Sequence, residues 1–432
     1  FEYCLMKYLK PDLYEGPSYK YYVLGVLTIV YSFNFIDRQL LVILQESIKQ
    51  EMDLSDSQLG LLSGFSFAIF YVLCGIPLAK LADRWIRRDV VAISITVWSS
   101  MTALSGFAQN FIHLLAARIG VAVGEAGGSP PAHAMISDIF TEERRATALA
   151  VYSMGINFGV LFGFLLGGWI NEFYGWRTAF LVVGLPGIGI AVLLKMTVAE
   201  PLRGMSQGIE DTRETPKLKE TLSLLWSRKS FRHLSLACAI HAFITYGAGN
   251  FVPSLFLRLH DIQSGELGSW LAVGAIFGGA GTFAGGYLSD HLGKKDKRWY
   301  QWIPALSTIL TLPFTIFVYT TGNTYLALAT TFLTSIFFSA YLAPNLAITH
   351  SLVGLRMRAM SSAVLFFILN LIGLGLGPLF IGMVSDFLNP TLGDESIRYA
   401  MVMTVPVLTV WSTVHYMFAA KYIRDDLANA PK

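Results

Sequence analysis

The sequence is short of charge, and this shortage narrows the class of protein. Only 14% of its 432 residues are Asp, Glu, Lys or Arg, whereas 54% are hydrophobic. A soluble globular protein has about 25% charged residues, so much of this chain cannot form a surface that faces water. The composition therefore predicts an integral membrane protein that lies in a lipid bilayer.

Cysteines and clustered catalytic groups are also scarce. The three cysteines, Cys4, Cys74 and Cys238, are far apart, and this spacing fits neither a metal site nor a disulfide framework. No paired histidines and no nucleophile with a nearby base lie at one depth of an apolar run, which argues against an intramembrane enzyme. The net charge of +3 gives no support for a nucleic-acid partner. We expect a non-enzymatic protein without a metal or cofactor.

What the chain has in abundance is long apolar stretches. Crossing about 30 Å of hydrocarbon takes about 20 residues, and twelve stretches reach that length. They lie at roughly 21–45, 57–82, 89–108, 112–137, 145–171, 177–197, 231–257, 267–289, 300–320, 324–350, 359–386 and 398–420. We therefore predict an all-α membrane protein with twelve transmembrane helices. Its two six-helix halves are 1–198 and 231–424, joined by a cytoplasmic linker at 199–230 and followed by a tail at 425–432.

Loop charges predict the orientation of these stretches. Lys and Arg concentrate in the loops that follow even-numbered stretches, which marks those loops as cytoplasmic. The basic residues of these loops include Arg84, Arg87, Arg88, Arg145, Lys294 and Arg358. The loop after the first stretch is net acidic, with Glu51, Asp53 and Asp56. Both termini are predicted to be cytoplasmic, and the absence of any Asn-x-Ser/Thr sequon favours a bacterial inner membrane.

The two halves contain an internal repeat. After the second stretch the chain reads "PLAKLADRWIRRD", and after the eighth it reads "FAGGYLSDHLGKKDK". Aligning Asp83 with Asp290 places Arg87 on Lys294. A second pair of segments, 138–150 and 353–365, follows at nearly the same offset. Two such correspondences indicate that the halves are structurally related.

These segments resemble the G-x-L-a-D-r-x-G-r-[RK] signature of the major facilitator superfamily. The second copy keeps Gly286 and Gly293, whereas Ala79 and Ile86 replace the glycines in the first. "RIGVAVGEA" at 118–126 and "GWRTAF" at 175–180 are also similar to the superfamily. The resemblance implies the major facilitator fold, with alternating access and stretches 1, 4, 7 and 10 around a central cavity. Ion pairs of Asp83 with Arg87, and of Asp290 with Lys294, are then candidates for a cytoplasmic gate; solvated loop charge is the alternative. The full candidate gate comprises Asp83, Arg84, Arg87, Arg88, Arg145, Asp290, Lys294 and Arg358.

Four glycines recur every fourth residue in the fifth stretch. Gly155, Gly159, Gly163 and Gly167 therefore share one helix face, where small residues let another helix approach closely. We expect this face to serve packing rather than direct contact with a substrate.

Four ionisable residues lie inside the apolar stretches, where they are costly and are functional candidates. Asp37 and Arg38 lie in the first stretch, and Arg118 and Glu125 lie in the fourth. Arg118 and Glu125 are seven residues apart and share a helix face, while Asp37 and Arg38 diverge by about 100°. We expect Arg38 or Arg118 to neutralise Glu125 or Asp37. The four residues form either a switch that a proton operates or a fixed ion pair that orients two helices.

The combination of "FIDRQ" with "GVAVGEAGGSPPAHAMISDIF" resembles the Spinster branch of the superfamily. That resemblance implies transport of lysophospholipids or sphingosine-like lipids, with Asp37, Arg38 and Glu125 in proton-linked gating and a proton gradient as the energy source. Carriers of sugar acids and aromatic acids can have similar motifs, so a proton-coupled carrier of small organic anions stays open. A transporter-like receptor is a further alternative.

The substrate candidates are polar and aromatic residues of the stretches that the resemblance places near the cavity or the interface of the halves. They are Phe33, Asn34, Tyr152, Asn157, Thr245, Tyr246, Asn250, Phe337, Tyr341, Asn345, Phe366 and Asn370. The second half has no ionisable residue well inside a stretch except His241, which we interpret as a packing residue. A charged first half opposite a neutral, aromatic second half suits an amphiphile. We expect a monomer whose partners are this lipid-like substrate, the bilayer and protons.

Overall fold

The structure is a computed structural model that describes residues 11–14, 16–205, 218–354 and 357–431. In these ranges every extended regular element is a helix. The contacts between residues divide the chain into two compact units. Unit 1 comprises Phe1–Met52 and Ser66–Arg213, and unit 2 comprises Asp53–Phe65 and Glu214–Lys432.

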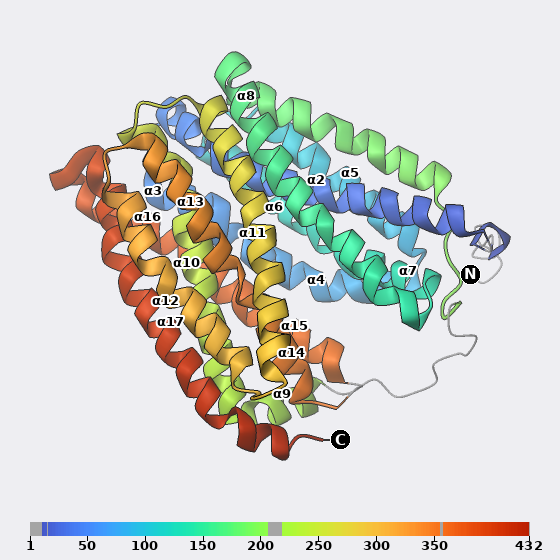
Figure 1. Cartoon of the computed structure of the whole chain (residues 1–432). Coiled ribbons are helices and arrows are strands. Elements are labelled where there is room, and N and C mark those ends of the chain that lie inside the picture. The colour runs from blue at the N-terminus through green and yellow to red at the C-terminus, as the bar shows by residue number, and fades with distance from the viewer. Residues whose placement is uncertain (1–10, 15, 206–217, 355–356, 432) are drawn as a thin grey trace. The chain divides into compact units, whose positions relative to one another are not determined.

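Unit 1 is built around a long first helix that packs against the last one. Its elements are η1 (Pro11–Tyr14), α2 (Pro17–Met52), α4 (Ser66–Arg84), α5 (Arg87–Ser105), α6 (Phe111–Ala126), α7 (Ser129–Ile139) and α8 (Glu142–Thr197). Two predicted stretches share α8, which is broken at Gly175, where φ is +79°. Its two arms run side by side in opposite directions, in green in Figure 1. The positive φ explains the glycine, because other residues rarely adopt it.

Unit 2 contains the remaining helices. They are α3 (Asp56–Gly60), η2 (Leu61–Phe65), α9 (Leu218–Ser227), α10 (Lys229–Leu259), α11 (Ser264–Gly293), α12 (Trp299–Thr320), α13 (Thr324–Ser339), α14 (Leu342–Ser351), α15 (Arg358–Ile368), η4 (Leu369–Leu376), α16 (Gly377–Leu392), η5 (Gly393–Glu395) and α17 (Ser396–Ala428). Here α10 packs on α17, and α17 packs on α12. Helix α9 lies within the linker predicted at 199–230.

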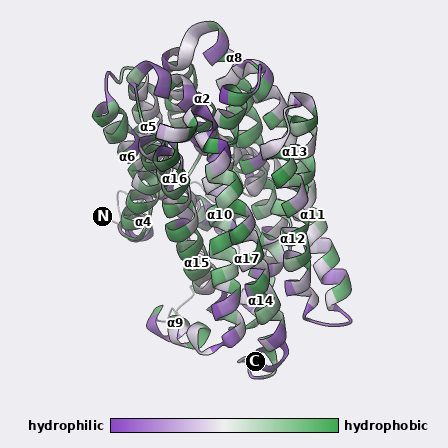
Figure 2. Cartoon of the chain, turned by 90° about the vertical axis from the view of Figure 1, so that its left-hand side faces the viewer, coloured by the Kyte–Doolittle hydropathy of each residue, from purple (hydrophilic) through white to green (hydrophobic). Residues whose placement is uncertain are grey.

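All twelve predicted stretches lie on helices. Among the described residues, nine helical ranges are long and apolar enough to cross a membrane, and the ranges at 143–197 and 360–428 each hold two of the stretches. Large apolar side chains such as Leu73, Met196, Phe283 and Phe387 are more than half exposed. In Figure 2 hydrophobic residues cover the sides of α10, α12 and α17, while hydrophilic residues gather at helix ends and on α9. This distribution suits helices surrounded by lipid.

The glycine face of α8 holds α2 at close range. A methyl group on Gly159 would lie 2.6 Å from the carbonyl oxygen of Ser32, and one on Gly163 would lie 2.7 Å from Cβ of Gln39. Gly155 and Gly167 approach α2 in the same way. Because real Cβ contacts are longer than this, only glycine permits the observed spacing. The predicted packing face thus fixes the position of the helix that carries Asp37 and Arg38.

The fourth predicted stretch is interrupted beside its acid. Helix α6 ends at Ala126, and α7 begins at Ser129 with proline in its first turn. Pro130 and Pro131 therefore start α7, where a missing backbone N–H costs little. Gly124 lets α5 approach, because a methyl group there would lie 2.6 Å from the backbone nitrogen of Trp98. The small residues around Glu125 make room for a neighbouring helix.

Candidate functional site

A buried ion pair in unit 1 joins α2 to α6. The Nε atom of Arg38 donates a hydrogen bond of 2.8 Å to Oε2 of Glu125, and Nη2 of Arg38 lies 2.8 Å from the same oxygen. The Glu125 side chain is fully buried, whereas 18% of the Arg38 side chain is exposed. Charge-assisted pairs of this kind are among the stronger hydrogen bonds in proteins. Of the two adjacent residues in α2, it is Arg38 that faces Glu125.

Asp37 points to a different neighbour. Its Oδ2 atom accepts a 3.0 Å hydrogen bond from the hydroxyl of Thr102 on α5, and its Oδ1 atom is buried without a hydrogen-bond partner in the described part of the chain. Arg118 is 2% exposed and its Nε atom is also unpartnered there, as is Oε1 of Glu125. The cluster thus contains two acids, two arginines and three buried polar atoms that can still accept or donate a hydrogen bond.

Aromatic rings surround the arginine of the pair. The guanidinium carbon of Arg38 lies 5.0 Å from the ring centre of Phe35, 4.7 Å from that of Phe67 and 5.3 Å from that of Tyr71. Arg118 also lies over Phe67, at 5.5 Å. Each such contact is worth about 0.5–2 kcal/mol, more where water is excluded. The rings supply a place where Arg38 can remain when its carboxylate is neutralised.

The chemistry of this cluster follows from its charges. With both acids ionised, two negative and two positive charges balance within a buried site. Adding one proton to Glu125 removes the charge that Arg38 binds and leaves a net positive charge, which is unfavourable away from water. The partly exposed Arg38 then favours an anionic group of a substrate, so protonation and anion binding can be coupled.

The substrate candidates of unit 1 are dispersed around the cluster. Asn34 is buried and lies close enough to Glu125 to interact with its carboxylate. Phe33 lies near Gly187 in the second arm of α8. Tyr152 is buried and stacks on Tyr31, with ring centres 4.4 Å apart, and Asn157 is exposed. Within this unit, Asn34 is the substrate candidate that the structure joins to the charged residues.

In unit 2, His241 belongs to a buried polar network. Its Nδ1 atom lies 3.1 Å from the hydroxyl of Thr308, and its Nε2 atom lies 2.9 Å from the carbonyl of Phe338. Its ring stacks on Tyr341 at 3.9 Å. Since both ring nitrogens have partners, the histidine acts as the packing residue that the sequence suggests. Asn345 is also buried, bonded to Gln301 at 3.0 Å and to a backbone carbonyl.

Of the remaining candidates of unit 2, Tyr246 packs with Tyr341 against the same buried cluster. Thr245 is exposed and bonds to the backbone of its own helix. Phe337 stacks on Phe314, with ring centres 5.8 Å apart, and Phe366 is 39% exposed. Tyr246, Asn250 and Asn370 are half-buried.

The expected pair between Asp83 and Arg87 is absent from the described residues. Arg87 is buried and pairs with Asp138 and, at 2.9 Å, with Glu200. Asp83 is exposed at the end of α4, where its backbone carbonyl accepts a hydrogen bond from Arg203. The predicted Asp83–Arg87 pair is wrong because Arg87 begins a new helix and points inward, away from the exposed end of the preceding helix. Asp138 and Glu200, and not Asp83, are the acids that pair with Arg87.

Two other candidate gate residues of unit 1 differ in burial. Arg88 is buried, bonded to Asp89 at 2.8 Å and, through its backbone nitrogen, to Glu200 at 2.9 Å. Arg84 is exposed and Arg145 is half-buried.

The corresponding pair in unit 2, Asp290 with Lys294, is also absent from the described residues. Asp290 accepts a 2.7 Å hydrogen bond from the hydroxyl of Tyr300, and Lys294 and Arg358 are exposed. The acid that binds arginines is Asp296, at 2.8 Å from Arg298 and 2.6 Å from Arg424. Partial burial raises the pKa of the Asp296 carboxyl, but the hydrogen bonds from these arginines outweigh it and lower that pKa to about 2. The turn between α11 and α12 thus places a different acid beside the basic cluster.

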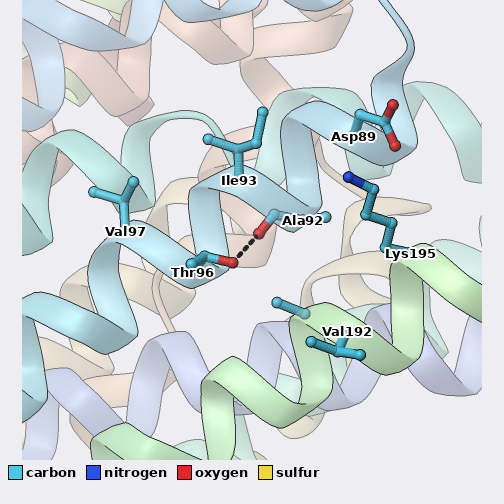
Figure 3. Close-up of a pocket in the computed structure, with 8 residues that line it drawn as sticks. Asp89, Ala92, Ile93, Thr96, Val97, Val192 and Lys195 are labelled. Atoms are coloured by element: carbon cyan, nitrogen blue, oxygen red, sulfur yellow. Dashed lines mark hydrogen bonds between the residues drawn. The ribbon is translucent and has the colours of Figure 1, made fainter.

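A separate groove lies on the surface of unit 1 between α5 and the second arm of α8. Figure 3 shows Asp89 and Lys195 at one end and the apolar side chains of Ile93, Val97 and Val192 along its length. None of the predicted functional residues lines this groove. The charged cluster and the groove are therefore distinct features of the unit.

Comparison with known proteins identifies relatives of the whole chain. Residues 27–378 match the family described as Major Facilitator Superfamily. An "MFS-type efflux pump" of Mycolicibacterium smegmatis is 33% identical over 422 residues, which cover 96% of each chain. The solved structure of a bacterial homologue of the human lysosomal transporter Spinster, in an inward-facing and unoccupied conformation, is similar with a TM-score of 0.88. It is 32% identical and covers 95% of this chain and 99% of the other. These matches confirm the predicted fold class and branch.

More distant relatives divide over the substrate. The "Sphingosine-1-phosphate transporter SPNS2" of Danio rerio is 25% identical over 436 residues, covering 94% of this chain and 86% of the other. The "Probable galactarate/D-glucarate transporter GudP" of Bacillus subtilis is 28% identical over 305 residues, covering 65% of this chain and 67% of the other. One name specifies a lipid and the other a sugar acid. Both substrates are anionic.

Proposed function

Because this chain belongs to the major facilitator superfamily and, within it, to the Spinster branch, we propose that it is a proton-coupled transporter of lysophospholipid or sphingosine-like amphiphiles. The observation that carries the proposal is the pair of Glu125, fully buried, and Arg38, partly exposed and surrounded by aromatic rings. It places a proton acceptor and an anion-binding cation in direct contact. Transport proceeds by alternating access of the two six-helix halves.

The proton acts through competition for Arg38. Ionised Glu125 holds the guanidinium at 2.8 Å. Protonated Glu125 has lost its negative charge, and Arg38 becomes available for the headgroup of a substrate. A phosphate group fits this role, since the planar guanidinium can donate two parallel hydrogen bonds to it. Asp37 and Arg118 complete the charge balance around the pair.

The rings beside Arg38 favour an amphiphile. Phe67 is buried beside Arg38, and the half-buried Tyr71, which stacks on it with ring centres 5.7 Å apart, offers apolar surface next to the cation. A substrate with an anionic head and a hydrocarbon tail uses both features. The name of the sphingosine-1-phosphate transporter among the relatives supports this class, while the name of the sugar-acid transporter supports small organic anions as the second candidate.

Flux into proteoliposomes tests the proton role. A lysophospholipid flux that rises with an imposed pH gradient is expected for the unmodified protein. In Glu125→Gln the gradient should no longer change the flux, because the amide cannot exchange a proton in this pH range. Glu395→Gln is the matched control, since Glu395 is an acid on the surface of unit 2. A flux in Glu125→Gln that still follows the pH gradient contradicts the proposal.

Thermal stabilisation by ligands separates the two substrate classes. Lysophospholipids should slow thermal unfolding of the purified protein, and galactarate should not. The reverse result selects the organic-anion carrier. We also propose that the protein is a monomer in a bacterial inner membrane with both termini in the cytoplasm. The accessibility of terminal epitope tags tests the orientation, and mass measurement in detergent tests the monomeric state.

A further inference from the structure

Two histidines from different helices meet within unit 2. The Nδ1 atoms of His233 on α10 and His415 on α17 lie 2.9 Å apart, and the ring centres are 5.1 Å apart. One hydrogen lies between these nitrogens, so one ring donates and the other accepts. The accepting ring must then carry its proton on Nε2. Neither Nε2 atom has a hydrogen-bond partner among the described residues, so the pair keeps an N–H group that can donate to a ligand.

Aromatic rings extend this pair along one face of α17. The ring of His233 stacks on Phe418 and Tyr422, with ring centres 5.2 and 5.9 Å apart, and the ring of Trp411 lies 6.2 Å from that of His415. Positions 411, 415, 418 and 422 are three or four residues apart, so they share a helix face. Trp411 is 49% exposed and Phe418 is 42% exposed. Exposed rings near the end of a spanning helix are typical of the headgroup level of a bilayer.

Three cations surround these rings. The Nζ atoms of Lys229 and Lys421 lie 5.3 and 5.7 Å from the ring centre of Tyr422. Arg232 adjoins His233 and is close enough to interact electrostatically with its ring. All three cations are exposed, and none of them pairs with an acid within the described ranges. Two helices thus bring positive charge without an acidic partner to one place beside the histidine pair.

The acids at this end of α17 do not supply the missing partner. The carboxylate of Asp426 accepts a 2.7 Å hydrogen bond from the backbone nitrogen of Ser230, which satisfies an N–H group in the first turn of α10. Asp425 is exposed and forms no ion pair in the described part of the chain. Both acids follow Tyr422 by about one turn, towards the end of the helix. The acids therefore lie nearer to water, and the cations lie beside the rings.

We propose that this end of unit 2 binds an anionic phospholipid of the bilayer. The lipid phosphate accepts a hydrogen bond from the histidine pair and lies among the cations, while the acyl chains run along the exposed rings of Trp411 and Phe418. The proposal goes beyond the transport function, because the bound lipid is a resident of the membrane and not the cargo. The headgroup patch comprises Lys229, Arg232, His233, His415, Lys421 and Tyr422.

The charges and the rings together select this class of ligand. Clustered basic residues beside a spanning helix attract anionic headgroups, and long basic side chains reach the headgroup level while their stems stay in hydrocarbon. A free phosphate ion would use the cations but leave the rings uncovered. A zwitterionic lipid would cover the rings but bring a further positive charge close to the lysines. An anionic diacyl lipid matches both features.

Native mass spectrometry of the full chain in detergent measures this binding without transport. Phosphatidylglycerol is compared with phosphatidylcholine of the same acyl chains, and the unmodified protein should bind the anionic lipid more tightly. Lys229→Gln with Lys421→Gln should weaken phosphatidylglycerol binding about thirtyfold, which corresponds to about 1 kcal/mol for each lysine. Equal affinity of the unmodified protein for the two lipids, or an unchanged affinity in the double variant, overturns the proposal.

Lys219→Gln with Lys295→Gln is the matched control. Both residues are exposed lysines of unit 2 that lie outside the headgroup patch, so the control loses the same net charge. It should bind phosphatidylglycerol as tightly as the unmodified protein does. An equal loss of affinity in the control shows that the net charge of the protein, and not the headgroup patch, attracts the lipid, and this result also overturns the proposal.

His415→Phe tests the hydrogen bond that the histidine pair donates. Phenylalanine keeps a ring in the stack but has no nitrogen. This variant should weaken phosphatidylglycerol binding about two- to tenfold, as expected for one hydrogen bond, and should leave phosphatidylcholine binding unchanged. An equal loss for both lipids shows that the ring only packs, and it overturns the role of the histidine pair.

Two further measurements separate the headgroup patch from a site for soluble phosphate and from the transport site. Glycerol phosphate should not displace phosphatidylglycerol at the same concentration, because it has no acyl chains; equal displacement overturns the assignment to a lipid. Arg38→Gln should keep phosphatidylglycerol binding, whereas its loss there places the lipid at the transport site and overturns the proposal. If the patch binds phosphatidylglycerol but the protein carries no lysophospholipid, the patch stands and the proposed substrate is wrong.

Discussion

Gly159→Ala is the change for which the structure gives the sharpest packing consequence. The added methyl group would lie 2.6 Å from the carbonyl oxygen of Ser32 and closer still to Cβ of Phe35. Both atoms belong to or adjoin the backbone of α2, so rotation of a flexible side chain cannot relieve the clash. Helix α2 must shift relative to α8. Overpacking of this kind costs about 1–3 kcal/mol.

The shift should also reach the charged cluster. Asp37 and Arg38 follow Phe35 by one turn or less on the same helix, and a 2.8 Å bond from Arg38 to Glu125 tolerates little displacement. We therefore expect Gly159→Ala to lower the apparent melting temperature in detergent and to reduce flux even in protein that remains folded. The loss of flux should be larger than the loss of folded protein.

Gly189→Ala is the matched control in the second arm of α8. A methyl group at Gly189 would meet nothing within 4 Å, and replacing a helical glycine by alanine commonly stabilises by about 0.5–1 kcal/mol. The control should melt at the same or a higher temperature and keep its flux. If both variants melt alike, or if Gly159→Ala melts lower but transports normally, the close approach of α2 and α8 does not position the charged residues as argued.

Two further predictions concern the ring of Phe67 beside Arg38 and the loop acid Asp296. Phe67→Leu removes the ring nearest to Arg38, at 4.7 Å, and should raise the KM for lysophospholipid flux severalfold, whereas the exposed Phe387→Leu should not; equal KM values exclude the ring as part of the site. The lowered pKa of Asp296, about 2, means that its stabilising effect is complete above its unfolded pKa of about 3.9 and is lost as the pH falls towards 2. Thermal unfolding of Asp296→Asn should therefore vary less than that of the unmodified protein between pH 4 and pH 2, and parallel curves contradict this assignment.

The helices and the charged pair could be predicted because each depends on local or strongly constrained features. A stretch of about 20 apolar residues has few folded alternatives in a membrane, and charges within such a stretch must find each other. The spacing of Arg118 and Glu125 placed both on one face. This spacing could not predict whether Arg38 or Arg118 binds Glu125, because the rotation of α2 about its axis depends on the glycine contacts with α8.

The residues that sequence reasoning missed are those whose partners come from distant segments. Asp138 and Glu200 bind Arg87 from two other parts of the chain, and the motif alone suggested its sequence neighbour Asp83. Phe67 and Tyr71 had a usable signal, since residues four apart share a helix face, but nothing local linked that face to Arg38.

Asp56 gives the clearest case of a residue whose role depends on distant parts of the chain. By sequence it is one of three acids in a loop, which predicts a solvated carboxylate. In the structure it is buried because Arg258 and Ser385, more than 200 residues away, provide its hydrogen bonds. A buried carboxylate is strongly unfavourable without its partners, so the burial of Asp56 depends on residues that its own loop does not contain.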